Sequence, residues 1–147
     1  LNMKYSVGHT GRVILVRLDE DEDVLSTLQV LARKETIQGG LFFIIGNLKK
    51  GNLVSGAKRE KIPIQPLWNH FKKNHEILGI GTIFQTKGQP EIHLHAALGR
   101  GKKSQMGCPR DKSNVFLISE IIVFELLGLK ASREKDRRTG LHLLKIK

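Results

Sequence analysis

The chain has 147 residues, the length of one ordinary domain, and its single cysteine excludes an internal disulfide, which fits a reducing compartment. Its 25 lysines and arginines against 14 aspartates and glutamates give a formal net charge of +11, which suits a polyanionic partner but also serves solubility alone. No apolar run approaches the roughly 18 residues of a membrane span, and the N-terminus lacks the apolar segment of a signal peptide; we therefore expect a soluble, cytoplasmic protein.

The first third of the chain predicts a strand, a helix and a second strand. Gly11–Leu18 is rich in β-branched residues and predicts a strand. Apolar residues at helical spacing predict an amphipathic helix over Asp21–Lys34, and the acidic run Asp19–Asp23 lies at its N-terminus, where negative charge is favourable. Leu41–Leu48 is apolar on both faces and predicts a central strand, within which Gly46 indicates a bulge or a close backbone approach.

The remaining residues predict further strands and no second helix. Lys49–Asn52 is turn-like, so Leu53–Lys58 is expected to return as a hairpin strand, and the proline-bearing Arg59–Lys73 as an irregular excursion. The later strands are expected at His75–Gln85, Glu91–Leu98, Asn114–Leu127 and Gly140–Ile146. Many strands, short turns and one helix predict a single α+β domain on a largely antiparallel sheet, residues 11–147, behind an N-terminal extension, residues 1–10.

A pair of histidines in one predicted strand is the strongest chemical signal. His93 and His95 stand two positions apart, so their side chains leave the same face of an extended strand. If the chain reverses through Gly99–Gln105, Cys108 returns beside them as a third donor. Two imidazoles and a thiolate, with a fourth position open, form a chemically sound zinc site. The alternative is one exposed and one core histidine beside a buried thiol.

The order of these elements resembles the plant-and-prokaryote-conserved (PPC) domain family. Its members run from a strand and a helix to a glycine-bearing strand near Gly-x-Gly-x-Leu, then Phe-Glu-Ile-Leu-Ser-Leu-x-Gly, His-Leu-His and Gly-Gly-His. The corresponding segments here, over most of Gly11–Ile146, are Ile45–Leu48, His75–Gly81, Ile92–Ala96 and Met106–Cys108, with a closing Thr-Gly-Leu at Thr139–Leu141.

The resemblance implies a twisted antiparallel sheet, a homotrimer, and zinc held by the His-x-His pair plus a later histidine. Carried over by position, the ligands are His93, His95 and Cys108, with cysteine where the family has histidine. A thiolate is also a zinc ligand, and a change from histidine to cysteine keeps metal-binding chemistry, so we expect the site to hold zinc; the alternative is that the metal is lost and Cys108 is a small buried residue. Glu76 is a candidate outer hydrogen-bond partner of a ligating histidine, or a rim carboxylate at a subunit contact.

Three functions are compatible with these features, and we expect the first, a binding protein. The first is a DNA-associated protein of low sequence specificity that uses Arg100, Lys102 and Lys103, the basic residues between the two halves of the predicted metal site. The second is a small zinc-dependent lyase or hydrolase, because the fold and site also resemble those of acetolactate decarboxylase; no general acid or base stands out. The third is a trimeric interaction scaffold with structural zinc. Phosphate-loop, dinucleotide-binding and Cys-x-x-Cys motifs are absent.

Overall fold

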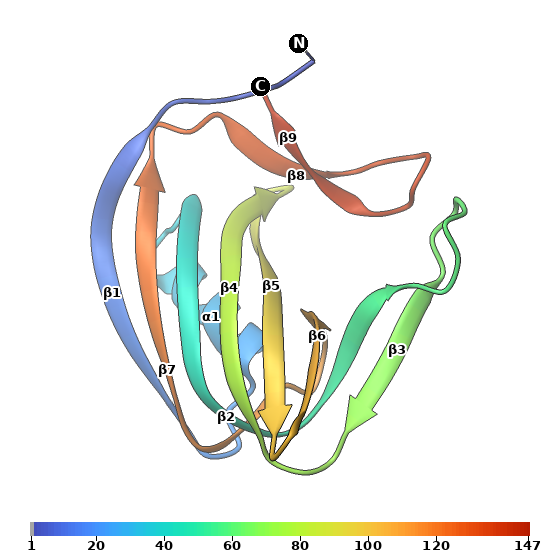
Figure 1. Ribbon diagram of the computed structural model, residues 1–147. Coiled ribbons are helices and arrows are strands. Elements are labelled where there is room, and N and C mark those ends of the chain that lie inside the picture. The colour runs from blue at the N-terminus through green and yellow to red at the C-terminus, as the bar shows by residue number, and fades with distance from the viewer. Residues whose placement is uncertain (1) are drawn as a thin grey trace.

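The computed structural model describes residues 2–147, so that residue 1 of the expected N-terminal extension lies outside the described residues (Figure 1). The elements in chain order are β1 (His9–Asp19), α1 (Val24–Lys34), β2 (Gly39–Ala57), β3 (Pro66–Phe71), β4 (His75–Thr86), β5 (Gln89–Arg100), β6 (Lys103–Pro109), β7 (Asn114–Leu127), β8 (Ala131–Lys135) and β9 (His142–Ile146). Between residues 2 and 147, no helix has the length and apolar character to cross a membrane.

One large antiparallel sheet dominates the molecule. Its strand order is β1-β7-β2-β4-β5-β6, and β3 pairs with β2 off this path. The last two strands, β8 and β9, form a separate hairpin that lies across one end of the sheet (Figure 1). The expected single domain with a largely antiparallel sheet and one helix is therefore present, but the fold contains more sheet than a plain α+β label implies.

The helix α1 covers one face of the sheet and forms the core with it. Its buried residues are Val24, Leu28 and Ala32, at the spacing of one helical face. Asp23 caps the helix by accepting a hydrogen bond of 2.9 Å from the backbone nitrogen of Ser26. The acidic run thus lies at the N-terminus of the helix, as the sequence predicts.

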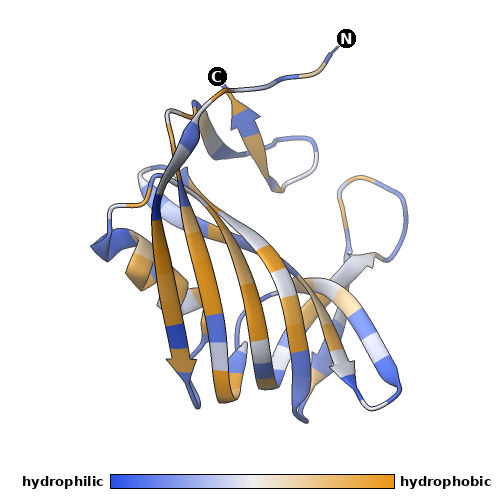
Figure 2. Cartoon of the chain, turned by 60° about the vertical axis from the view of Figure 1, so that its left-hand side comes forward, coloured by the Kyte–Doolittle hydropathy of each residue, from blue (hydrophilic) through white to orange (hydrophobic). Residues whose placement is uncertain are grey.

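The opposite face of the sheet is apolar but exposed. Along β2, Phe42 and Ile44 are fully buried against the helix side, whereas Phe43 and Ile45 point outward into solvent. One register row crosses this outward face through five aligned residues: Leu15, Ile122, Phe43, Ile80 and His95. Leu15 and Ile80 are 76% and 55% exposed. Figure 2 shows the apolar residues that run along these neighbouring strands. We call this surface the outward apolar face.

The predicted turn at Lys49–Asn52 is wrong, because β2 continues through it to Ala57. The first half of β2 pairs with β4 and β7, and its second half crosses over to pair with β3 and β6. Ladder pairing holds the turn-like residues extended: Lys50 pairs with Asn114, and Gly51 pairs with Phe71. A Cβ at Gly51 would lie 2.7 Å from Cζ of Phe71, so the glycine there permits close packing rather than a turn.

Two short strands were not expected from the sequence. The irregular excursion predicted over Arg59–Lys73 contains β3, in which Pro66 is the first residue of an edge strand, a position that tolerates proline. The strand β8 pairs with β9 but has only five residues, too few for a clear alternating pattern. By contrast, Gly46 behaves as predicted: its φ is 135°, and a Cβ there would lie 2.6 Å from the carbonyl oxygen of Ile118.

Candidate metal centre

The β5–β6 hairpin brings the predicted donor residues together. The chain turns at Gly101 and Lys102, and antiparallel pairing runs from Arg100–Lys103 to Ala96–Gly107. This register places Cys108 across from His95. Leu94 and Ala96 point into the core, so strand parity turns His93 and His95 to the other face. The reversal through the glycine- and lysine-rich segment is therefore confirmed.

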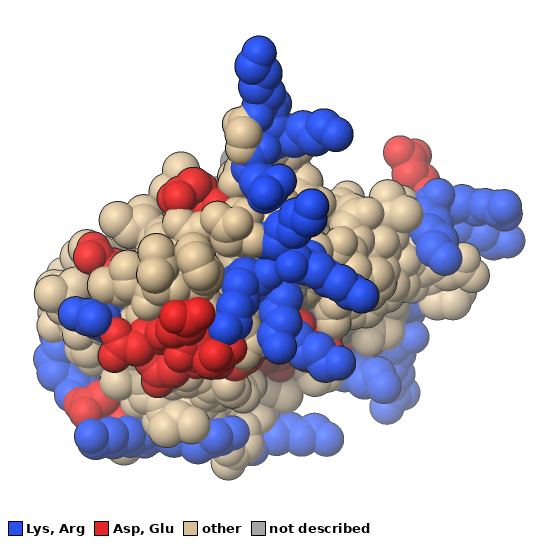
Figure 3. Space-filling view, turned by 90° about the horizontal axis from the view of Figure 1, so that it is seen from below, with Lys and Arg blue, Asp and Glu red and all other residues tan. Residues whose placement is uncertain are grey.

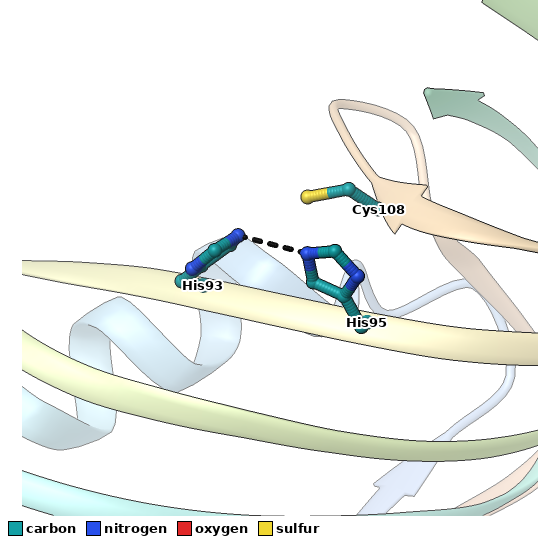
Figure 4. A group of neighbouring side chains, drawn as sticks. All are labelled: His93, His95 and Cys108. Atoms are coloured by element: carbon teal, nitrogen blue, oxygen red, sulfur yellow. Dashed lines mark hydrogen bonds between the residues drawn. The ribbon is translucent and has the colours of Figure 1, made fainter. Parts of the chain in front are cut away.

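The three side chains converge on one place from two strands (Figure 4). Their donor atoms, two imidazole nitrogens and the sulfur, all lie within 4.8 Å of one another. The Nε2 atoms of His93 and His95 are 3.1 Å apart. Two nitrogen ligands of a tetrahedral zinc ion, each at 2.0–2.1 Å, are separated by about 3.3 Å. The spacing of the histidines in the structure is thus close to that of two ligands of one metal ion.

Burial sets the protonation of two of the donors. Burial lowers the pKa of His93 to about 4, with further lowering by the charges of Arg133, His95 and Arg110. The imidazole of His93 is therefore neutral at neutral pH. Burial also raises the pKa of the Cys108 thiol. A metal bound there must displace the thiol proton, whereas it meets no competing charge on His93.

An arginine of the C-terminal hairpin, Arg133, contacts His93 at the nitrogen that does not face His95. Nη2 of Arg133 lies 3.0 Å from Nδ1 of His93 and donates at 3.1 Å to Oγ1 of Thr82. A guanidinium has only donors, so Nδ1 of His93 accepts this bond and the ring carries its proton on Nε2. That Nε2 proton then points to Nε2 of His95. Arg133 was not expected at the site from the sequence, because β8, which positions it, was not predicted.

A carboxylate and a third histidine lie at the edge of the same region. Oε2 of Glu91 accepts hydrogen bonds from Oγ1 of Thr86 and, at 2.7 Å, from Nδ1 of His142 on β9. Although burial opposes ionisation, these hydrogen bonds and the charges of His142 and Arg133 lower the pKa of Glu91 overall. The glutamate is therefore ionised and already engaged with two side chains.

The donor set fits a divalent metal ion in its chemistry. Imidazole nitrogen and thiolate sulfur are the ligands that zinc prefers, and three protein ligands leave a position open. One feature of the site opposes ligation. A histidine that binds metal through one nitrogen normally donates from the other to a carboxylate or carbonyl, but Nδ1 of His93 faces the donor Arg133. Metal binding through Nε2 of His93 therefore requires this contact to change.

The structure places Glu76 away from the donor atoms. Its Oε1 accepts a hydrogen bond of 2.6 Å from Nδ2 of Asn47 on the neighbouring strand. In the β4–β5 ladder Glu76 pairs with Gly99, whereas His95 pairs with Ile80. Ile80 lies four residues beyond Glu76 along β4. At roughly 3.3 Å per residue this separation is about 13 Å along the strand. Glu76 instead lines a hollow of about 520 Å³ on the outward apolar face, beside Ile45 and Leu78.

The basic candidates Arg100, Lys102 and Lys103 lie at the tip of the β5–β6 hairpin. They are separated from His95 and Cys108 by about five residues of strand, or roughly 16 Å. They adjoin the lysines at the middle of β2 and before β4, because Leu48 pairs with His75 at the same end of the sheet. Seen from this end, lysine and arginine side chains gather beside a patch of acidic side chains (Figure 3). The basic surface and the donor cluster are thus two separate regions.

Comparison with known proteins gives the family. The family model of the Plants and Prokaryotes Conserved (PCC) domain, also abbreviated PPC, matches residues 5–127. The chain belongs to the PPC family. The β8–β9 hairpin that carries Arg133 follows the matched segment. No curated protein sequence matches the chain.

Solved structures share the whole fold. A PPC protein of Pyrococcus horikoshii is 26% identical, with a TM-score of 0.85 and 99% of each chain covered. A metal-containing protein of Archaeoglobus fulgidus is 22% identical, with a TM-score of 0.86 over 97% of this chain and 99% of the other. A protein of Ralstonia eutropha JMP134 called "putative DNA-binding protein" is 23% identical, with a TM-score of 0.75 and 90% of each chain covered.

Proposed function

We propose that this PPC protein binds one divalent metal ion, zinc, through His93, His95 and Cys108. The observation that carries the proposal is the approach of three donor atoms, from two strands, to within 4.8 Å of one another. The similar fold of a metal-containing protein from Archaeoglobus fulgidus supports it. Zinc suits the set better than magnesium or calcium, because those ions prefer oxygen ligands.

The residues around the donors have separate roles in this proposal. His93, half-buried, supplies a neutral imidazole that its strand holds in place. Cys108 is only 5% exposed and supplies a thiolate after losing its proton. His95 is exposed in the single chain, so the open side of the site lies next to it, at the edge of the outward apolar face. A bound zinc ion with an open position polarises a ligand or activates water.

Metal analysis of the purified protein tests this function directly. The protein is stripped with a chelator, loaded with zinc, passed through a desalting column and assayed by mass spectrometry. We expect about one zinc per chain. Zinc-free protein after loading at neutral pH would contradict the proposal. A parallel loading with magnesium and calcium serves as a control, because the nitrogen and sulfur donors should leave both ions unbound.

We infer a second function, association with DNA, from the basic end of the sheet. The hairpin tip carries Arg100, Lys102 and Lys103, close in register to the lysines in the middle of β2 and before β4. The helix α1 buries its apolar face in the core and begins beside acidic residues, so it is unsuited to a groove. Binding would use phosphate contacts and read little sequence. A similar protein of Ralstonia eutropha carries the description "putative DNA-binding protein".

We also propose that the protein assembles as a homotrimer through the outward apolar face. Exposed leucine, isoleucine and phenylalanine side chains form a continuous row across four strands there. Exposed contiguous apolar surface of this kind marks an interaction site. A second copy of the chain is the occupant that a symmetric assembly provides without another partner. Light scattering at micromolar concentration tests it, and a mass near the 16.5 kDa of one chain would contradict it.

A further inference from the structure

A pocket opens beside His93 between the sheet and the C-terminal hairpin. Its volume is about 330 Å³, and it is lined by Glu91, His93, Arg110 and Arg133, with Gly140–Leu144 of the hairpin closing one side. This volume is at the small end of ligand sites. The pocket lies next to the proposed metal ligand His93, and two of the charged side chains that line it are arginines, Arg110 after β6 and Arg133 on β8.

Arg133 has hydrogen-bonding capacity left over in this pocket. Arg133 is only 7% exposed. Its terminal nitrogens donate to the carbonyl oxygen of His142 at 3.3 Å, to Thr82 and to His93. Its buried Nε has no hydrogen-bond partner. A buried donor without a partner is unfavourable, and burial lowers the pKa of this guanidinium. A negative charge in the pocket would offset the cost of burying this guanidinium.

The charges on the pocket walls favour an anion. Two guanidinium groups, of Arg110 and Arg133, face one carboxylate, that of Glu91. Glu91 is engaged with Thr86 and His142. Over residues 2–147, neither arginine belongs to an ion pair. One carboxylate does not balance two guanidinium groups, and Arg133 is buried, where excess positive charge is unfavourable; the pocket walls therefore keep a net positive charge.

Metal binding would make the need for an acceptor stronger. With a metal on Nε2, neutral His93 carries its proton on Nδ1, and that N–H then faces the N–H of Arg133, 3.0 Å away in the structure. Two donors cannot bond to each other. An oxyanion beside both nitrogens would accept from each, and its negative charge would offset the guanidinium.

We propose that this pocket binds a small oxyanion, a carboxylate or a phosphate, between Arg133 and Arg110, and that the anion and the metal bind cooperatively. The cooperative part rests on the proposed metal function, whereas the anion site rests on the pocket itself. Because coupling is reciprocal, the anion strengthens zinc binding by the same factor by which zinc strengthens anion binding. The site would thus recognise a small molecule through its anionic group, with the rest of that molecule beside the open side of the metal.

The test measures both partners in the full chain. Zinc stoichiometry is fixed first by metal analysis. Acetate and inorganic phosphate are then titrated calorimetrically into zinc-loaded and metal-free protein, and zinc affinity is measured against a competing chelator with and without each anion. We expect saturable binding of at least one anion, and tighter zinc binding in its presence. The anion that binds more tightly shows which group the natural ligand carries, since a carboxylate site favours acetate and a phosphate site favours phosphate.

Three arginine variants test whether the anion binds in this pocket. Arg133→Met keeps the apolar stem but removes the donors, and we expect it to load zinc yet to bind the anion at least about tenfold more weakly, the loss expected for a charge-assisted hydrogen bond worth about 1.5–3 kcal/mol. Arg110→Met tests the second wall, and, because this residue is exposed, the change should not disturb folding. Arg137→Met, at an exposed position of the same hairpin, is the matched control and should bind as the wild type does.

Each result that differs from these expectations overturns a distinct part of the proposal. Zinc-loaded wild type that binds neither anion, or an Arg133→Met variant that binds as tightly as wild type, overturns the anion site and leaves the metal function standing. The latter result would place the anion on the metal alone. Protein that loads no zinc overturns the cooperative part, and anion titration of the metal-free protein then decides the remainder. If Arg133→Met does not fold, Arg110→Met gives the same decision.

Discussion

Nη2 of Arg133 lies 3.0 Å from Nδ1 of His93, joining two residues that are 40 positions apart. The arginine belongs to the C-terminal hairpin, and the histidine belongs to the central sheet. The contact fixes the imidazole in the tautomer with its proton on Nε2, the nitrogen that faces His95. The hairpin therefore controls the hydrogen bonding of a proposed metal ligand, which gives this peripheral element a direct part in the chemistry of the site.

Removal of a donor should abolish tight zinc binding. Cys108→Ser and His95→Ala each take away one donor of the cluster. We expect zinc affinity to fall by more than the roughly 10–100-fold that the loss of an outer hydrogen-bond partner of a ligand costs. Competition with a chromophoric chelator measures this. Ser104→Ala, on the exposed part of the same hairpin, is the control and should retain wild-type affinity; equal losses in all three variants would indicate a folding defect instead.

The stability of the metal-free protein should fall in acid through His93. Its pKa is about 4 in the folded protein, against an ordinary value of 6.5, so between these values the unfolded chain binds the additional proton. The contribution of the neutral ring is complete above pH 6.5 and is lost as the pH falls toward 4. Urea unfolding of wild type and His93→Gln across this range measures the difference. The wild type should lose stability more steeply, and parallel curves would rule out the buried neutral histidine.

A charge on the outward apolar face should prevent self-association. Phe43 lies in the middle of the exposed row, so Phe43→Glu would bury a carboxylate in the proposed subunit contact. We expect the variant to be a folded monomer by light scattering and circular dichroism. The control is Val30→Glu, which places the same charge at an exposed apolar position on α1. It should keep the mass of the wild type; a monomer in both cases would remove the specific role of this face.

The hairpin tip should account for part of the salt dependence of DNA binding. Replacement of Arg100, Lys102 and Lys103 by alanine should flatten the slope of log K against log salt by up to about three units, because each neutralised phosphate contributes roughly −0.9. Fluorescence anisotropy over a salt series measures the slope. A triple variant at the other end of the molecule, Lys130, Arg137 and Lys147 to alanine, removes the same charge. Equal effects of the two variants would indicate a diffuse charge effect and no localised interface.

A methyl group at Gly81 should destabilise the fold. A Cβ there would lie 2.1 Å from Cζ of Phe42, which is fully buried and has no space to retreat. We expect Gly81→Ala to cost about 1–3 kcal/mol, as overpacking of a core does, measured by urea unfolding. Gly99→Ala is the matched control, because a Cβ on that strand glycine contacts nothing within 4 Å. In a Phe42→Leu background, Gly81→Ala should cost less than in the wild type, and an unchanged cost would rule out Phe42 as the cause.

The sequence correctly predicted the elements whose structure follows from the local spacing of their own apolar residues. Asn114–Leu127 was predicted with its observed bounds, and the helix differs only at its start, which lies at Val24 instead of Asp21. The prediction failed where long-range pairing overrides local preference. Lys49–Asn52 has the composition of a turn, yet it remains extended because strands from three distant parts of the chain pair with β2. Hydrogen bonds supplied by those strands outweigh the turn preference of four residues.

The sequence alone determined which side chains could share a face of the sheet. The spacing of His93 and His95 sets their parity, and a reversal between Gly99 and Gln105 brings Cys108 back to them, because alternation along a strand is a local property of the backbone. Only the tertiary structure decided what surrounds them. The approach of Arg133, and of His142 to Glu91, depends on where a separate hairpin packs, and that position is set by contacts between segments far apart in the chain, for which no local spacing exists.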